Sequence, residues 1–438
     1  MEQTPEPKAR PQVSLIFSFG GGETSDVGPF LSSFEYKAMV NGGYIIRGKF
    51  FDTNFNRLDE LIKQGYFLNA RDPAGQIMVK FQIRWGPESE TEMNISRTGK
   101  MTAALLTLKH SGKDSSDKGL LEFVAIDPPS FYLNSGLGTG EVYTGTASDV
   151  MKQVIEYYTP CKVTISKTYD NEKNKWYMLR QDPKTFISSM IDWSPSLTAT
   201  KTHWIVSSHD NNIYIEEQGK IKANPRGYYN LLDVSSHSDI KTWEMLADHG
   251  LAQTQSALIT QGVSAISGQY LDWYSDPQEK YVVIKDENTP NKQIAQIKSD
   301  RGFKKPSSII GASSISSIPE IYSAGDLGYQ YQDYIDGRPR GMWLNMINSV
   351  MRIKITIIGH GRYTSPYGLG TDYVYLAWTS GKESSGGGDR YYWMTGNWII
   401  YGFEHKVTRS FWYTDLYCAR FDYDSIAKKV GTAQLTPF

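Results

Sequence analysis

The sequence predicts a β-rich α+β fold, in which two tube-like antiparallel β-barrel domains flank and interleave with mixed α/β regions. Three observations support this fold. Apolar and polar side chains alternate with period two in residues 351–358, as in a half-buried strand. The runs that follow, up to residue 424, are rich in Tyr, Trp, Val and Ile and are bounded by Gly and Ser. A comparable series of strand-like runs fills residues 12–127.

The first predicted barrel covers residues 12–127 and carries one helix. Its strand-like runs lie at residues 13–21, 33–53, 76–86, 100–112 and 119–129. The step Asn41-Gly42-Gly43 divides the second run and is a hairpin signal. Residues 56–64 have Leu58, Leu61 and Ile62 on one face, which predicts a short helix.

Residues 128–200 are predicted to form a helix–strand–helix domain. The first helix is expected at residues 148–158, with Ser148 as its cap and an end before Pro160. Residues 161–170 alternate like a strand. Asp182 and Pro183 suit the N-cap and the first position of a second helix.

The remaining boundaries complete the predicted organisation. Residues 1–11 are expected to be a flexible arm and residues 426–438 a C-terminal tail. The second barrel combines residues 201–224, where a turn is expected at 210–212, with residues 351–425. Residues 225–350 are interpreted as an inserted mixed region. Two β modules flanking a mixed region indicate a cryptic duplication, although no sharp sequence repeat is visible.

Composition narrows the classes of function. The chain has 438 residues, enough for about two to four domains. Its formal net charge of −1 gives no global attraction to nucleic acid or to anionic membranes. Aromatic residues make up 13% of the chain, which suits cores and subunit interfaces.

The cysteines and the apolar runs of the sequence indicate the cellular compartment in which the protein folds. Cys161 and Cys418 are too few for a disulfide framework or a metal site, and we expect buried or half-buried thiols in a reducing cytoplasm. The N-terminus does not read as a signal peptide, and no apolar run approaches the ~20 residues that span a bilayer. The sequence therefore predicts no direct membrane insertion.

No residues are predicted to act as catalytic, cofactor-binding or metal-binding groups. Glu404 and His405 are neighbours in a strand, so they should face opposite sides. The glycine cluster at 136–140 does not run into a helix as a phosphate cradle would, and residues 380–389 are expected to form a hairpin loop. The other titratable groups considered are given structural or solvated roles: His203, His209, His360, Glu216, Glu217, Asp422 and Asp424.

Three segments carry a resemblance to a known family. They are GEVYTGTASDVMKQVIEYY at 140–158, WYMLRQDPKTFISSMI at 176–191 and NWIIYGFEHKVTRSFWYTDLYCARFD at 397–422. In this order they resemble the baseplate hub proteins of contractile-tail bacteriophages, the late-control or tail-hub family. The hub part of type VI secretion spikes is similar.

The resemblance implies a structural virion protein that is not an enzyme and uses no cofactor. Three subunits would supply two tube-like barrels each, giving a homotrimeric ring with pseudo-six-fold symmetry that joins the tail tube to the central spike. The implied partners are the spike, the tube protein, baseplate wedge proteins, the tape-measure protein and genomic DNA in transit. The implied location is the tail baseplate, assembled in the host cytoplasm.

Two other functions stay open at this stage. The Tyr and Trp content also suits a tail-associated protein that binds carbohydrate or degrades cell walls. Such a protein should gather its aromatic side chains on one exposed face. A host β-rich scaffold is the third interpretation.

Overall fold

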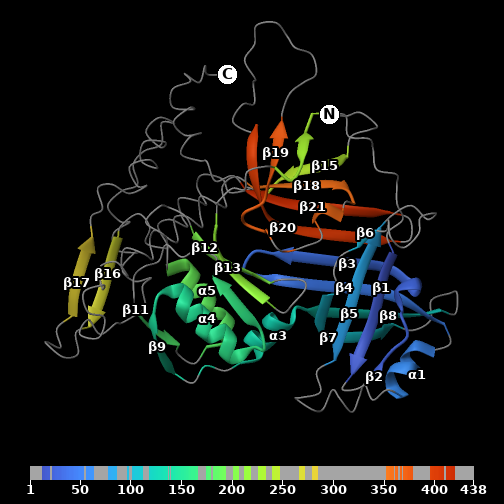
Figure 1. Ribbon diagram of the computed structural model, residues 1–438, viewed down its shortest axis with the longest axis horizontal. Helices are drawn as coiled ribbons and strands as arrows, with labels where there is room; N and C mark the ends of the chain where they lie inside the picture. The colour runs from blue at the N-terminus through green and yellow to red at the C-terminus, as the bar shows by residue number, and fades with distance from the viewer. Residues whose placement is uncertain are drawn as a thin grey trace, which may run out of the picture.

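The fold is a β-rich α+β structure built around one long, mostly antiparallel sheet (Figure 1). The computed structural model describes residues 12–19, 22–53, 56–63, 77–85, 96–97, 101–111, 118–136, 138, 140–165, 174–178, 181–193, 201–206, 212–218, 225–232, 239–246, 266–271, 279–284, 352–359, 361–363, 366, 368–377, 395–408 and 411–419. The predicted arm 1–11, the tail 426–438, the loop 380–389 and most of the insertion 225–350 lie outside these residues.

The elements follow one another along the chain with these bounds. The helices are α1 (Asn56–Lys63), α3 (Pro128–Ser135), α4 (Ala147–Tyr158) and α5 (Pro183–Trp193), and the short 3-10 turns are η1 (Gly28–Phe30) and η4 (Gly361–Tyr363). The strands are β1 (Gln12–Phe19), β2 (Gly22–Glu23), β3 (Leu31–Met39), β4 (Gly43–Thr53), β5 (Met78–Trp85), β6 (Ser96–Arg97), β7 (Met101–Ser111), β8 (Lys118–Ile126), β9 (Glu141–Gly145), β10 (Lys162–Ile165), β11 (Asn174–Met178), β12 (Lys201–Val206), β13 (Asn212–Gln218), β14 (Tyr228–Asn230), β15 (Ile240–Met245), β16 (Ile266–Leu271), β17 (Glu279–Ile284), β18 (Arg352–Ile358), β19 (Tyr373–Ala377), β20 (Gly396–Thr408) and β21 (Trp412–Ala419).

One sheet joins the N-terminal and C-terminal strands. Its order is β15-β18-β21-β20-β3-β4-β8-β7-β5-β1-β2, and β14, β19 and β6 branch from it. The junction is the antiparallel pairing of β20 with β3, which runs from Gly402 opposite Met39 to Thr408 opposite Ser33. In Figure 1 these strands lie side by side, with β1 and β5 crossing them steeply. We call the strands β1 to β8 the N-terminal, or first, module, and the strands β14, β15 and β18 to β21 the C-terminal, or second, module. The two modules therefore share one continuous sheet.

The local signals of the first module largely decided its structure. Asn41 takes a left-handed backbone conformation with φ of 60°, and the chain turns there from β3 into β4. Gly43 also has a positive φ, of 65°, where a side chain would be strained. The short helix expected at 56–64 is α1 and buries Leu61.

The helices of the mixed domain correct one predicted cap. Helix α4 begins at Ala147, and Thr146 caps it by accepting a hydrogen bond from the Asp149 amide at 3.2 Å. Ser148, the expected cap, lies inside the helix and is buried. The prediction for α5 is confirmed, since Asp182 Oδ1 accepts from the Thr185 amide at 2.8 Å and Pro183 is the first helical residue.

A further helix, α3, was not expected from the sequence. Pro128 and Pro129 were interpreted as a boundary, but they occupy the first turn of this helix. Asp127 caps it, accepting from the Ser130 amide at 2.8 Å, and also accepts from the Tyr44 amide at 2.8 Å. One carboxylate therefore ties the helical domain to the start of β4.

Strands β12 and β13 pair differently from expectation. The sequence assigned residues 201–224 to the second barrel, but β13 pairs with β12 and, in parallel, with β10 of the mixed domain. Residues 210 and 211 of the predicted turn lie outside the described part of the chain. The physical reason is that a strand's alternation shows its buried face but does not identify its neighbours.

Five strands of the N-terminal module are repeated in the C-terminal module. The β3–β4 register skips one residue between Leu31 and Ser33, and the β15–β18 register skips one between Ile240 and Thr242. The long hairpins match as well. The β7–β8 register is interrupted between Leu105 and Thr107, and the β20–β21 register between Ile400 and Gly402.

Constant offsets relate the repeated strands residue by residue. The series β3, β4, β8, β7, β5 corresponds in order to β15, β18, β21, β20, β19, and every shared register pair then coincides. Lys109 opposite Glu122, for example, matches Glu404 opposite Asp415. A bulge is a specific feature of a strand, so the two shared interruptions indicate a duplicated module.

The buried side chains form one contiguous core. It reaches from Phe17 and Phe81 in the first module, through Tyr36 and Phe403 at the junction, to Ile355 in the second. No helix within the described residues is long and apolar enough to cross a membrane.

Candidate functional site: the charged face of the joined sheet

The junction between β3 and β20 brings two similar segments together. Residues 34–38 read FEYKA and residues 403–407 read FEHKV, and they pair antiparallel with His405 opposite Tyr36. The middle residue of each segment faces the core, and its glutamate and lysine face the other side. Each glutamate lies opposite the lysine of the other strand.

His405 is the centre of the buried side of this junction. Its Nδ1 lies 2.9 Å from Thr414 Oγ1 and 3.2 Å from Trp412 Nε1, and its Nε2 lies 3.2 Å from the carbonyl oxygen of Tyr363. An indole N–H can only donate and a carbonyl can only accept. Nδ1 therefore accepts, Nε2 carries the proton, and the imidazole is neutral in this arrangement.

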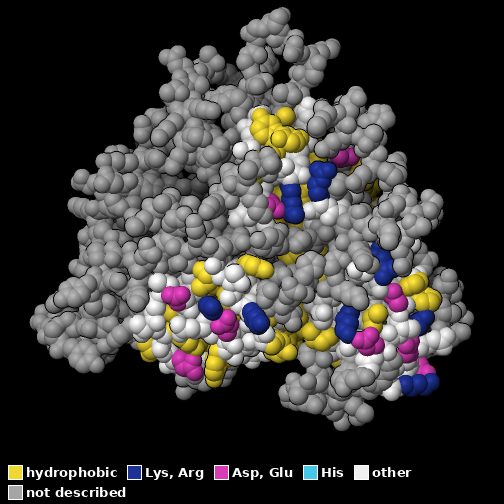
Figure 2. All heavy atoms as spheres, viewed as in Figure 1, with side chains coloured by type: hydrophobic (Ala, Val, Ile, Leu, Met, Phe, Trp, Pro, Cys, Tyr) yellow, Lys and Arg dark blue, Asp and Glu magenta, His cyan; other side chains and the backbone are white. Residues whose placement is uncertain are grey.

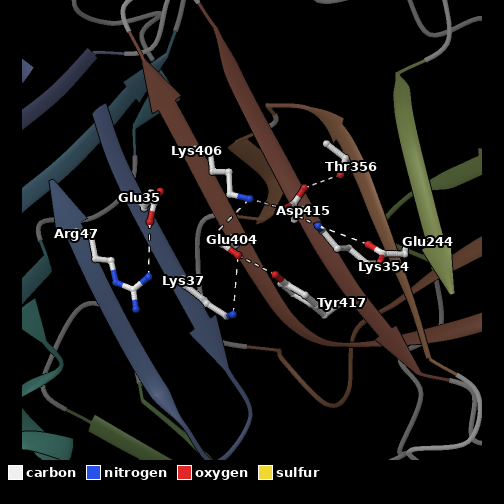
Figure 3. Close-up of polar contacts among 10 residues, drawn as sticks. All are labelled: Glu35, Lys37, Arg47, Glu244, Lys354, Thr356, Glu404, Lys406, Asp415 and Tyr417. Atoms are coloured by element: carbon white, nitrogen blue, oxygen red, sulfur yellow. Dashed lines mark hydrogen bonds and ion pairs between the residues drawn. The ribbon is translucent and has the colours of Figure 1, made fainter. Parts of the chain in front are cut away.

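Ten side chains on the opposite face form what we term the charge ladder (Figure 3). It crosses the sheet from β4 to β15. Successive ion pairs join Arg47 to Glu35 at 3.9 Å, Lys37 to Glu404 at 3.9 Å, Lys406 to Asp415 at 2.9 Å, and Lys354 to both Asp415 at 3.6 Å and Glu244 at 3.9 Å, and Thr356 and Tyr417 complete the set. Charges of opposite sign thus alternate from strand to strand.

Asp415 is the most enclosed member of the charge ladder, with a side chain 3% exposed. It accepts hydrogen bonds from Thr356 Oγ1 at 2.6 Å and from Lys406 Nζ at 2.9 Å. Burial acts to raise the pKa of Asp415, but these hydrogen bonds and the charges of Lys406 and Lys354 more than offset it. The net pKa lies below the ordinary value. Asp415 is therefore ionised at neutral pH and unsuited to donate a proton.

Hydrogen bonds and nearby charges also fix the side chains around Asp415. Burial acts to lower the pKa of Lys406, but the hydrogen bond and charge of Asp415 raise it above its usual range. Tyr417 donates to Glu404 Oε2 at 2.7 Å, and burial followed by that glutamate raises the pKa of Tyr417. Lys37 Nζ sits 5.0 Å from the centroid of the Tyr417 ring. These contacts keep the cations in fixed positions.

The duplication reproduces parts of the charge ladder. Glu35 with Arg47 and Glu244 with Lys354 occupy equivalent positions, and each pair is 3.9 Å apart. Lys49 bonds Glu122 at 2.7 Å where the second module has the Thr356–Asp415 bond. Figure 2 shows the same mixing on the visible surface, where blue and magenta side chains are interspersed. The face is polar and locally neutralised.

The structure places the other sequence-identified residues as follows. Glu404 and His405 face opposite sides, as predicted, and Cys161 and Cys418 are both buried, which confirms that prediction. Burial raises the pKa of the Cys418 thiol. His209, His360, Asp422 and Asp424 lie outside the described residues, as do the side chains of His203, Glu216 and Glu217. Within the described part of the chain, no three His, Cys, Asp or Glu side chains gather as a metal site would require.

Sequence reasoning missed the charge ladder. Its members were interpreted singly, as the polar side of alternating strands. The signal that could have identified it is the E-x-K spacing shared by β3 and β20, since that spacing puts opposite charges face to face only in an antiparallel pairing.

Two solved structures that are similar to this chain are tail proteins. A tail protein from Neisseria meningitidis matches with a TM-score of 0.52 at 11% identity, covering 93% of this chain and 97% of that one. A prophage tail protein of 43 kDa from Shewanella oneidensis matches with a TM-score of 0.50 at 11% identity, covering 93% and 98%. The predicted resemblance to phage tail proteins is thus confirmed at the level of the fold.

A weaker structural similarity links the chain to a component of a secretion system. An Escherichia coli component of the type VI secretion system matches with a TM-score of 0.42 at 8% identity, covering 92% of this chain and 76% of that one, and we base no argument on it. No protein-family model matches the chain, and no curated protein matches it either.

Proposed function

We propose that the chain is a structural hub of a phage tail baseplate, which joins the tail tube to the central spike. In this proposal three copies form a closed ring of six similar modules, and the chain performs no catalysis. In this proposal each of the two repeated modules supplies one of the two tube-like barrels expected from the sequence. The protein would assemble in the host cytoplasm and remain in the virion tail.

The duplication carries this proposal. A six-fold tube and a three-fold spike can both be matched by a trimer whose subunits each contribute two equivalent units. The two units here share matching registers, matching bulges and one sheet. Tail proteins with the same fold support the same role.

The charge ladder suits the wall of a channel. The channel would pass the tape-measure protein and then genomic DNA, so its wall should neither hold nor repel either polymer. Each carboxylate of the ladder has a lysine or arginine within 4.0 Å, which removes most of the local field. We assign the opposite, apolar face to the interior of the modules.

The carbohydrate-binding alternative draws less support from the structure. Its aromatic side chains should gather on one exposed face, but many of the described aromatics, among them Trp398, Tyr36 and Tyr363, are buried. They serve the core, as a structural protein requires.

Electron microscopy of the purified full-length chain, alone and co-expressed with the products of neighbouring genes, tests the hub proposal. End-on image averages are expected to show a ring of six similar lobes around a channel. Particles containing a single copy under every condition would overturn it.

A further inference from the structure

Residues of both modules line one cavity. It lies where β1 and β5 cross β3 and β20 (Figure 1), and its volume is about 380 Å³. Ligand sites have volumes of about 300–1,000 Å³ and favour the boundaries between structural units. The apolar part of the lining comes from four buried side chains: Val13, Leu31, Phe34 and Val407.

The turn before η1 lines the cavity and is fixed against β1. Asp26 Oδ1 accepts hydrogen bonds from the amides of Leu15 and Gly28, each at 2.8 Å. Its other carboxylate oxygen accepts from Ser14 Oγ at 2.7 Å. Gly28 approaches β1 so closely that an added Cβ would lie 1.8 Å from the Val13 carbonyl oxygen. The cavity wall is therefore preformed, and Asp26 has a fixed position on it.

The cavity carries one acidic and one basic side chain, and neither forms an ion pair within the part of the chain that the structure describes. Asp26 is exposed and accepts only from neutral donors. Arg84 of β5 is half-buried, and its Nε donates to Gln82 Oε1 at 3.2 Å. The carboxylates of the charge ladder, in contrast, all have a cation nearby. A ligand with charges of both signs would complement this cavity.

Exposed aromatic rings extend the apolar surface beyond the cavity. Phe30 is 38% exposed and follows Pro29, which lines the cavity. Phe411 is 45% exposed, and its amide donates at 3.2 Å to the hydroxyl of Thr408, another lining residue. This combined surface is larger than a single small molecule needs and suits a segment of polypeptide.

We propose that the cavity is a docking site for an extended peptide segment of another protein, in which an apolar residue lies between a basic and an acidic one. The apolar side chain would enter the cavity as an anchor against Leu31 and Val407. The basic residue would face Asp26, and the acidic residue would face Arg84. The bound segment would contact both modules. This inference goes beyond the proposed hub function and does not depend on the ring.

Titration of the full-length chain with capped synthetic peptides, followed by saturation-transfer NMR, tests the docking site. The probes have the cores Lys-Leu-Glu and Glu-Leu-Lys, one for each chain direction. At least one should bind saturably, with a dissociation constant of about 1 mM or lower. The same peptide with serine in place of leucine should bind at least tenfold more weakly, because it lacks the apolar anchor.

Substitutions of Arg84 identify the cavity as the place of binding. Arg84→Gln should weaken binding of the better peptide at least tenfold. Lys152→Gln on α4 also removes one positive charge but lies outside the cavity lining, so it should leave binding unchanged. Arg84→Glu should prefer a Lys-Leu-Lys core over the better of the two original cores. Misfolding would not produce such a reversal of preference.

No saturable binding of either peptide, equal binding of the serine analogue, or an Arg84→Gln protein that binds like the wild type would overturn the docking site. Free leucine or N-acetylglucosamine binding more tightly than the peptides would assign the cavity to a small molecule and would overturn it as well. The native mass of the same sample is a separate readout. A monomer that binds the peptide would contradict the hub and leave this site standing.

Discussion

His405 of β20 stacks on Tyr36 of β3, with ring centroids 5.9 Å apart and ring planes 26° apart. The two residues come from opposite ends of the chain and sit at equivalent places in two similar segments. Their contact joins the two modules into one sheet. The buried side of this junction holds the modules together, and the charged side forms one uninterrupted face.

Replacing His405 should destabilise the junction. His405→Phe keeps an aromatic ring but removes the hydrogen bonds to Trp412, Thr414 and the Tyr363 carbonyl. Leaving such groups unsatisfied in a core costs about 1–3 kcal/mol each, and we expect a total loss of about 3 kcal/mol after local relaxation. Urea unfolding measures it, with Gln153→Ala on the exposed side of α4 as the control, which should change stability by less than about 0.5 kcal/mol. A His405→Phe protein as stable as the wild type would show that these bonds contribute nothing.

The duplication predicts a compensating pair in the core. Gly48 of β4 packs under Phe123 of β8, where an added Cβ would lie 2.3 Å from the ring. The equivalent positions of the second module hold Ile355 and Leu416. Gly48→Ile alone should overpack the first module and cost about 3 kcal/mol.

The double variant Gly48→Ile with Phe123→Leu copies the second module's pair. It should recover at least about 1 kcal/mol relative to the sum of the single changes, which a double-mutant cycle on unfolding free energies measures. Strict additivity would show that the two modules do not pack equivalently at this position.

The pH dependence of stability should depend on Asp415. Its pKa is lowered in the folded protein, so its stabilising contribution is present above the unfolded value, about 3.9, and is lost as the pH falls through the folded value. Asp415→Asn should therefore cost about 1–3 kcal/mol at pH 7. The difference from wild type should shrink below about pH 4.

Glu244→Gln is the matched control for Asp415→Asn, because Glu244 belongs to the same charge ladder but is 66% exposed. It should change stability by less than about 0.5 kcal/mol. Equal effects of the two substitutions, or a difference for Asp415→Asn that does not vary with pH, would contradict the role given to burial.

Period two and turn chemistry were sufficient to predict most individual elements. The alternation of Ile353, Ile355 and Ile357 gave β18 its buried face, and the glycines after Asn41 gave the β3–β4 hairpin. The cap at Asp182 followed from a polar residue before Pro183. These signals are local, and the structure contains the strand, the hairpin and the cap that they predict.

Strand neighbours were not predictable in the same way. The pairing of β20 with β3 joins residues more than three hundred positions apart. Strand β13 pairs with β10 as well as with β12, because partner choice depends on the whole fold. The sequence indicated a duplication but showed no sharp repeat, because the modules conserve register and bulges while their side chains differ, as at Gly48 and Ile355. The charge ladder can be recognised only once those strand registers are known.

The native mass of the full-length chain in solution tests the central claim most directly. The expected mass is that of three chains, alone or with a trimeric partner from the neighbouring genes, because three chains supply the six similar modules of the proposed ring. A chain that remains a monomer at micromolar concentration with every such partner would contradict the ring and the hub function.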